Sequence, residues 1–273
     1  LSGINLEGNK FFYTNPLSAS DDYPYTLRWN GGRQPYISKS NCCPPNVVRT
    51  IAEASNYFYS QVKNGINKVI KTENKIDLVV ANAGYGGFAG IEDLSHDAVR
   101  QMFEVNVFGM DRTIRAALPQ MRKQRSGRII VTASVVAHVS LVGLGWYAAT
   151  KHAVEAMANA LRQEVKPLGI KVSVIEPGTV KTGFGKVAFD HLNEYRGIKD
   201  YEQVIRGFDK YLGGMYRMSP GPAKVLRAME KAALSKRPRP IYPASWDVRA
   251  LKFLFYAFPR SWVDAVVLWL AKH

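Results

Sequence analysis

Three short segments made almost entirely of apolar residues place the strongest constraint on the fold of this 273-residue chain. They are IDLVVANAG (76–84), GRIIVTAS (127–134) and IKVSVIEPG (170–178). Their apolar residues do not alternate with polar ones, which is typical of a strand buried on both faces of a parallel sheet. Each segment ends in glycine or serine, where the chain can turn. We therefore predict three central parallel strands.

Segments with helical periodicity follow these predicted strands. We expect helices over about 95–125, 144–167 and 220–235, and a short last strand in RPIYP (239–243). Strands that alternate with helices form a parallel sheet covered on both faces. The sequence thus predicts an α/β protein with a Rossmann-like, doubly wound parallel sheet over residues 67–273.

The first 66 residues differ in composition from the rest of the chain. Residues 1–42 are rich in Asn, Ser, Gly, Tyr and Asp, and FFYTNPL (11–17) and YTLRW (25–29) are typical of short strands between turns. Two prolines at 44 and 45 can open a helix, and KNG (63–65) predicts its end. We expect a separate strand-and-helix segment over 1–66, with a helix at 44–62 that covers a face or an open edge of the sheet.

Positive charge is concentrated toward the C-terminus. The net charge is +15, and residues 203–273 hold 13 Lys and Arg but 4 Asp and Glu. Such a surface suits an anionic membrane, a nucleic acid or a phosphorylated cofactor, or it is a solvated basic face. No zinc-finger spacing and no basic-aromatic RNA motif accompanies it, so we do not expect a nucleic-acid partner.

Residues 250–270 are strongly apolar, but Lys252, Pro259, Arg260 and Asp264 interrupt them. We therefore do not expect a membrane-spanning helix. Two alternatives stay open: a helix packed on the core or on a second subunit, and an interfacial contact with a membrane. The two adjacent cysteines form no disulfide framework, which indicates a reducing compartment or a metal. We expect a cytoplasmic protein, with membrane association through 250–270 as the open alternative.

A tyrosine and a lysine four residues apart, Tyr147 and Lys151, share one face of the helix expected at 144–167. An ammonium group beside a phenol favours the phenolate, so we expect this pair to transfer a proton to or from a carbonyl oxygen. The same spacing occurs at Tyr59/Lys63 and Tyr195/Lys199. Only Tyr147 has a serine thirteen residues upstream, Ser134, at the end of a predicted strand, where ligands bind in parallel sheets.

Several motifs, in order, resemble those of the short-chain dehydrogenases/reductases over about residues 67–273. ANAG (81–84) is similar to the family's Asn-Asn-Ala-Gly stretch, although Ala81 replaces its first asparagine. Asn106 in NVFG, the set of Ser134, Tyr147 and Lys151, and PGTVKT (177–182) match the remaining motifs. The resemblance implies an oxidoreductase that uses NADP or NAD to interconvert a secondary alcohol and a ketone, and it makes a homodimer plausible.

The resemblance also assigns roles to these residues. It implies that Tyr147 exchanges the proton, that Lys151 lowers the pKa of Tyr147 and binds the nicotinamide ribose, and that Ser134 binds the substrate oxygen. Asn106 would hold a water molecule in a proton relay; an alternative is that Asn82 and Asn106 only satisfy backbone groups. The remaining residues implied to bind the cofactor are Asn82, Ala83, Gly84, Pro177, Gly178 and Thr182.

Aromatic residues are frequent between 183 and 218, which we expect to form a substrate loop. They include Phe184, Phe189, Tyr195, Tyr201, Phe208, Tyr211 and Tyr216. Such a lining suits a large lipophilic alcohol or ketone, and the alternative is a lid that only packs.

The glycine-rich turn that binds the cofactor pyrophosphate in this family has no counterpart in the sequence. GINLEG (3–8) and NGG (30–32) neither follow a buried strand nor precede a helix. We therefore expect the sheet to lack the family's first three strands, which leaves the strand at 76–81 as an exposed edge. We also expect weak cofactor binding and impaired activity.

Residues 8–66 resemble the β-L-arabinofuranosidases of glycoside hydrolase family 127, and CCPPN (42–46) carries this resemblance. It implies that Cys42 is a nucleophile and zinc ligand and that Cys43 is a second ligand. The chain has no further cysteine, whereas tetrahedral zinc needs four ligands. We therefore favour an inert pair of thiols. Two alternatives to an active oxidoreductase stay open: a non-catalytic chimeric or truncated product, and a β-L-arabinofuranosidase remnant.

Overall fold

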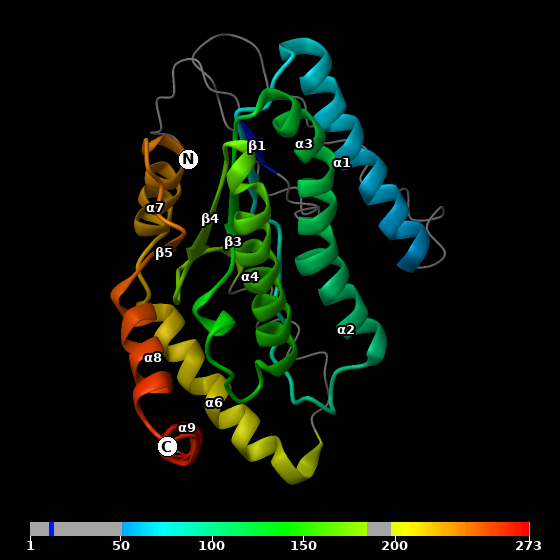
Figure 1. Cartoon of the computed structure of the whole chain (residues 1–273). Coiled ribbons are helices and arrows are strands. Elements are labelled where there is room, and N and C mark those ends of the chain that lie inside the picture. The colour runs from blue at the N-terminus through cyan, green and yellow to red at the C-terminus, as the bar shows by residue number, and fades with distance from the viewer. Residues whose placement is uncertain (1–10, 14–50, 185–197, 273) are drawn as a thin grey trace.

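A five-stranded parallel sheet forms the centre of the part of the chain that the computed structural model describes, which is residues 11–13, 51–184 and 198–272 (Figure 1). The strands follow one another in sequence order across the sheet. They are β1 (Phe11–Tyr13), β2 (Leu78–Ala81), β3 (Gly127–Thr132), β4 (Ile170–Glu176) and β5 (Ile241–Pro243). The predicted parallel α/β sheet is confirmed, and so are the three central strands.

The edge of β2 is covered, which corrects the expectation of an exposed edge. Phe11 pairs in parallel with Leu78, and Tyr13 pairs with Val80. The N-terminal segment thus supplies a short strand at this position. Unpaired backbone N–H and C=O groups at an apolar sheet edge are unfavourable. A segment of unrelated sequence can pair with them, because backbone pairing does not depend on the side chains of the strand that it replaces.

Helices cover both faces of the sheet, as a doubly wound fold requires. One face carries α1 (Ile51–Glu73), α3 (Gly109–Gln124) and α4 (Gly145–Val165). The apolar core beneath them includes Val79, Ile129, Met121 and Val154, all at most 2% exposed. On the opposite face, Ile130 and Ile175 pack against Ala232 of α7 (Ala223–Leu234).

The helix expected at 44–62 is described from Ile51 to Glu73 and so continues past its predicted end. The prediction that KNG would end it is wrong. A glycine in a helix interior costs about 1 kcal/mol, but Ile66 beyond it is 1% exposed, and Val69 and Ile70 pack against the same core. The helix continues because this burial outweighs the cost of Gly65, and Asn74 ends it with a positive φ of 55°. The composition break at residue 66 therefore lies inside a helix.

The helical span expected at about 95–125 is confirmed in extent but is not one regular helix. It consists of α2 (His96–Phe103), a π-helical turn at Glu104–Phe108, and α3. Ser95 caps its start by accepting a hydrogen bond from the Ala98 backbone N–H at 3.2 Å. The π-helical turn contains Asn106, and such turns are frequent at functional sites.

The C-terminal part is more helical than expected. Residues 199–218, predicted as part of a loop, form α6 (Lys199–Met218), and the tail forms α8 (Trp246–Ala257) and α9 (Arg260–Lys272), separated at Pro259. Phe208 and Leu212 of α6 share a core with Val263 and Ala271 of α9, so the tail packs on the domain. Among the helices in the described residues, none combines the length and hydropathy needed to cross a bilayer.

Candidate active site

Ser134, Tyr147 and Lys151 meet where β3 leaves the sheet. Ser134 follows β3 by two residues in extended conformation, with φ −170°. Tyr147 and Lys151 lie on the first two turns of α4 and are 8% and 4% exposed. Ser134 lies close enough to Tyr147 to lower the pKa of its hydroxyl, and the Lys151 Nζ lies 5.8 Å from the centroid of the Tyr147 ring. The set selected from the sequence is therefore brought together.

Lys151 is fixed by the strand beside it. Its Nζ donates a hydrogen bond to the Thr132 backbone carbonyl at 3.0 Å. The hydroxyl of the same threonine donates to the Asn82 Oδ1 at 2.8 Å. Thr132 thus connects the lysine on α4 with the Asn82 segment after β2, and it was not selected from the sequence.

Asn106 joins the π-helical turn to the loop after β2. Its Nδ2 donates to the Tyr85 carbonyl at 2.8 Å and to the Thr150 Oγ1 at 2.9 Å, and its Oδ1 accepts from the Tyr85 N–H at 2.9 Å. These contacts agree with the alternative in which Asn106 satisfies backbone groups. The contacts also hold Asn106 close to the backbone of Gly84. A Cβ added to Gly84 would lie 3.0 Å from the Asn106 Oδ1 and 3.3 Å from the Lys151 Nζ.

Burial dominates the ionisation of the catalytic pair. Desolvation lowers the pKa of Lys151 to about 8. It also raises the pKa of Tyr147 well above its usual range, although the nearby Ser134 acts in the opposite direction. The pKa of Tyr147 is therefore raised, not lowered as the resemblance implies, because burial outweighs the lowering contributions. Both groups are removed from water, and desolvation disfavours the charged form of each.

The Pro177–Gly178 segment lies against Ser134 and α8. The Val135 N–H donates to the Pro177 carbonyl at 2.9 Å, and the Thr179 N–H donates to the Asp247 Oδ2 at 3.3 Å. A Cβ on Gly178 would collide with the Asp247 carboxylate, so only glycine permits this approach. Asp247 was not selected from the sequence, because no local pattern shows that α8 returns to this loop.

Thr182 lies near Tyr216 of α6. Its Oγ1 accepts a hydrogen bond from the Phe184 N–H at 3.3 Å, and its side chain acts to lower the pKa of Tyr216. Burial raises the pKa of Tyr216 to about 12. The ring of Phe184 lies 5.6 Å from that of Tyr147, centroid to centroid. Aromatic residues from the predicted substrate segment therefore reach Tyr147.

The predicted residues Asn82, Ala83 and Gly84 follow β2, and Pro177, Gly178 and Thr182 follow β4, at the same end of the sheet as Ser134. Cys42 and Cys43 lie outside the described residues, as do Phe189 and Tyr195.

Comparison with known proteins agrees with this geometry. The family model of the short chain dehydrogenases matches residues 53–193, and that of the β-L-arabinofuranosidase GH127 catalytic domain matches residues 1–56. A probable short-chain type dehydrogenase/reductase of Helicobacter pylori, VdlC, is 30% identical, with 71% of each chain covered. The 3-ketodihydrosphingosine reductase of Bacteroides thetaiotaomicron is 30% identical over 74% of this chain and 73% of its own.

Among solved structures, a short chain dehydrogenase/reductase of Burkholderia phymatum in complex with NAD superposes with a TM-score of 0.60. It is 25% identical, with 72% of this chain and 70% of that chain covered. The chain belongs to the short-chain dehydrogenase family. Its first 56 residues instead match the arabinofuranosidase domain, and the two matches overlap at residues 53–56.

Proposed function

We propose that this protein is a NAD(P)(H)-dependent oxidoreductase that interconverts a lipophilic secondary alcohol and a ketone. The observation that carries the proposal is the buried set of Ser134, Tyr147 and Lys151 at the carboxyl end of the sheet. Ligands of open parallel sheets bind at this end. The solved relative in complex with NAD has the same fold.

In the proposed mechanism, Tyr147 donates its phenolic proton to the ketone oxygen. Its raised pKa keeps it protonated at neutral pH, which suits the direction of reduction. Ser134, which lies beside Tyr147, holds the same oxygen. Lys151 is fixed through Thr132 where it can bind a ribose hydroxyl. The cofactor, when bound, supplies the hydride.

The residues fit the two halves of the cofactor unequally. At the nicotinamide half, the segments after β2 and β4 and the lysine of α4 converge. At the pyrophosphate half, β1 pairs with β2 where the family's first strand would lie, but the sequence after it, TNPLSAS (14–20), has no glycine. A tight turn with backbone N–H groups aimed at phosphate requires glycine. We propose that the chain binds the dinucleotide weakly.

Titration calorimetry tests this imbalance directly. If the pyrophosphate and adenosine half contributes little, NADPH and reduced nicotinamide mononucleotide should bind with dissociation constants within about threefold of each other. A complete site would bind the dinucleotide far more tightly, so micromolar or tighter binding of NADPH would contradict the proposal of a weak site. A hydride-transfer assay with millimolar NADPH and a series of ketones of increasing chain length tests the activity itself.

The proposal of a lipophilic substrate rests on the aromatic side chains near Tyr147. The Phe184 ring packs at a tilt against the Tyr147 ring, and the half-buried Tyr216 is close enough to influence the pKa of Tyr147. One relative is named for the reduction of 3-ketodihydrosphingosine, a long-chain ketone. We expect kcat/KM to rise with the chain length of a 2- or 3-ketone, and equal values for acetone and a ten-carbon ketone would contradict the proposed substrate class.

The outer face of the C-terminal helices supports a contact with an anionic membrane surface. Large side chains project from α8 and α9 into solvent: Trp246, Phe253, Tyr256, Trp262 and Trp269 are each more than half exposed. Arg249, Arg260 and Lys272 lie on the same two helices. Exposed aromatics beside basic residues suit the headgroup region of a bilayer.

Vesicle flotation separates this contact from other occupants of the surface. We expect the protein to float with vesicles containing 30% phosphatidylserine, to be released by 0.5 M salt, and to lose binding in a Trp262→Ser/Trp269→Ser variant. A concentration-dependent dimer in sedimentation that the same double variant abolishes, without vesicle binding, would instead assign this face to a second copy of the chain.

The alternatives to an active oxidoreductase depend on the first 56 residues. Their match to the arabinofuranosidase domain favours a chimeric product that joins pieces of two enzymes. It also leaves open a glycosidase remnant with Cys42 and Cys43 as a partial zinc site. Metal analysis of the purified chain, compared with a Cys42→Ser/Cys43→Ser variant, tests this remnant. One zinc per chain that disappears in the variant would revive the metal site.

A further inference from the structure

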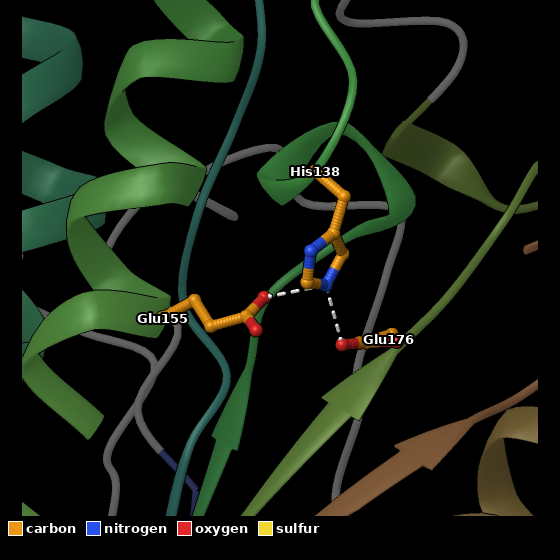
Figure 2. A group of neighbouring side chains, drawn as sticks. All are labelled: His138, Glu155 and Glu176. Atoms are coloured by element: carbon orange, nitrogen blue, oxygen red, sulfur yellow. Dashed lines mark hydrogen bonds and ion pairs between the residues drawn. The ribbon is translucent and has the colours of Figure 1, made fainter. Parts of the chain in front are cut away.

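A buried charged cluster lies behind the candidate active site, formed by His138, Glu155, Glu176 and Lys252 (Figure 2 shows the first three). Glu155 is 7% exposed and Glu176 is 0% exposed. The His138 Nε2 lies 3.0 Å from the Glu155 Oε2 and 2.7 Å from the Glu176 Oε1. Charged side chains are rarely buried this deeply unless an opposite charge or a hydrogen bond compensates them.

The cluster adjoins each segment of the active site. His138 comes four residues after Ser134, at the end of the 3₁₀ turn Val135–Ala137. Glu155 is one helical turn beyond Lys151 on α4, and Glu176 is the last residue of β4, directly before Pro177. Any change in these contacts therefore acts on the three segments that carry the proposed catalytic and cofactor-binding residues.

Lys252 of α8 supplies the cation of this cluster. Its Nζ lies 3.2 Å from both carboxylate oxygens of Glu176 and 2.9 Å from the His138 Nε2. Histidine and two glutamates would also suit a divalent metal, because their ligand atoms lie within 4.8 Å of one another. A metal ion would face the Lys252 ammonium at close range, so we favour the lysine as the cation.

The number of protons in the cluster follows from its contacts. Two carboxylates, one ammonium and a neutral imidazole carry a net charge of −1, which one additional proton neutralises. The single ring nitrogen Nε2 contacts oxygens of both glutamates, and one hydrogen on it can point toward only one of them. The Glu155 Oε2 has no hydrogen-bond partner with acceptable geometry. One further proton, held by the coupled cluster as a whole, neutralises this charge, and on the Glu155 carboxyl it removes an unpaired buried anion.

We propose that His138, Glu155, Glu176 and Lys252 hold one shared proton and that this neutral cluster positions the segments of Ser134, Lys151 and Pro177. These are positioning residues, which act on the reaction only through the segments they join. Their role in turnover depends on the oxidoreductase activity proposed above, whereas the shared proton does not.

The ionisation of Glu155 agrees with this proposal. Burial raises the pKa of the Glu155 carboxyl, and Glu176 raises it further, against the opposing effects of His138 and Lys252. Asn159 on α4 also acts to lower this pKa, and Tyr256 on α8 lies beside the imidazole, with its hydroxyl 3.4 Å from the His138 Nδ1. A raised pKa means that the folded protein keeps a proton that the unfolded chain has lost, so stability falls as pH rises through the pKa.

Urea unfolding between pH 5 and pH 9 tests the shared proton without any assay of activity. The amide in a Glu155→Gln variant replaces the protonated carboxyl and cannot lose its proton. The ratio of the unfolding constants, wild type to variant, should rise about tenfold per pH unit from about pH 5 up to the apparent pKa of the cluster. The matched control is Glu164→Gln, an exposed glutamate on the same helix, whose ratio should stay constant.

Amide hydrogen exchange tests the positioning role. Segments 133–139 and 176–182 should exchange equally in wild type and Glu155→Gln at pH 6 but faster in wild type at pH 9, with α1 as the unchanged reference. A pH-independent ratio of unfolding constants would overturn the shared proton, as would one zinc per chain lost on Glu155→Gln substitution. Equal exchange at pH 9 would overturn the positioning role. If hydrogen exchange differs as expected but the protein shows no turnover, only the proposed oxidoreductase activity is contradicted.

Discussion

The residues of the proposed cofactor site fit the nicotinamide half of the dinucleotide better than its pyrophosphate half. At the nicotinamide half, Asn82, Thr132 and Lys151 are linked by hydrogen bonds of 2.8 and 3.0 Å. At the pyrophosphate half, β1 supplies backbone pairing to β2, but no glycine follows it until Gly31. Backbone pairing is independent of side chains, whereas a phosphate site needs a particular turn. A sheet can therefore be completed by a segment that does not restore binding.

The largest effect that would sharpen this comparison is the loss of the proton donor. Tyr147→Phe should lower kcat for ketone reduction by about 10²–10⁴-fold, the usual contribution of general acid–base catalysis. The thermal midpoint should change little, because the ring and its contact with Phe184 remain. Tyr211→Phe, at a tyrosine that is 37% exposed on α6, is the control. Equal rates for Tyr147→Phe and wild type would remove Tyr147 from the mechanism.

The next largest effect concerns the buried cation of the nicotinamide half. Because the pKa of Lys151 is about 8 when folded and about 10.4 when unfolded, wild type should gain stability as pH rises from 8 to 10.4. Relative to Lys151→Met, which carries no charge, this gain should approach about 3 kcal/mol. Urea unfolding across this pH range measures it. Lys210→Met, at an exposed lysine on α6, should show no such gain; a similar gain there would contradict the assignment to Lys151.

The hydrogen bonds of Asn106 should be worth less but remain measurable. Asn106→Ala removes partners from both backbone groups of Tyr85, and leaving buried polar groups unsatisfied costs about 1–3 kcal/mol. Chemical unfolding measures the loss, with Asn67→Ala, at an exposed asparagine on α1, as the comparison. Equal loss of stability in the two variants would mean that the hydrogen bonds of Asn106 to the loop after β2 do not stabilise the fold.

The smallest effect tests the close approach at Gly84. Alanine there would place a Cβ 3.0 Å from the Asn106 Oδ1 and 3.3 Å from the Lys151 Nζ, and we expect a cost of about 1–2 kcal/mol from overpacking. The matched control is Gly87→Ala, whose Cβ would meet only the Met102 Cε at 3.6 Å. Thermal unfolding of both variants should separate them, and a Gly84→Ala protein as stable as Gly87→Ala would show that the neighbours move aside.

The sequence predicted the elements that carry the site but not the contacts between them. Ser134, Tyr147 and Lys151 were found because their spacing and the strand before them are local patterns. The π-helical turn around Asn106 was not, since its residues have the same periodicity as a regular helix. The end predicted for α1 was wrong because Ile66, beyond Gly65, is buried against the sheet, and burial of this kind depends on distant residues.

By itself, the sequence determined the three central strands, the helices that follow them, and the order of the motifs that resemble the short-chain dehydrogenases over about residues 67–273. These depend on apolar periodicity and on short spacings, which are properties of neighbouring residues. Only the tertiary structure decided that β1 covers the edge of β2, that burial dominates the pKa of Tyr147, and that Glu176 meets Lys252 of α8 beside His138 and Glu155. Pairing, desolvation and charge contacts depend on distances in space, which a linear pattern does not contain.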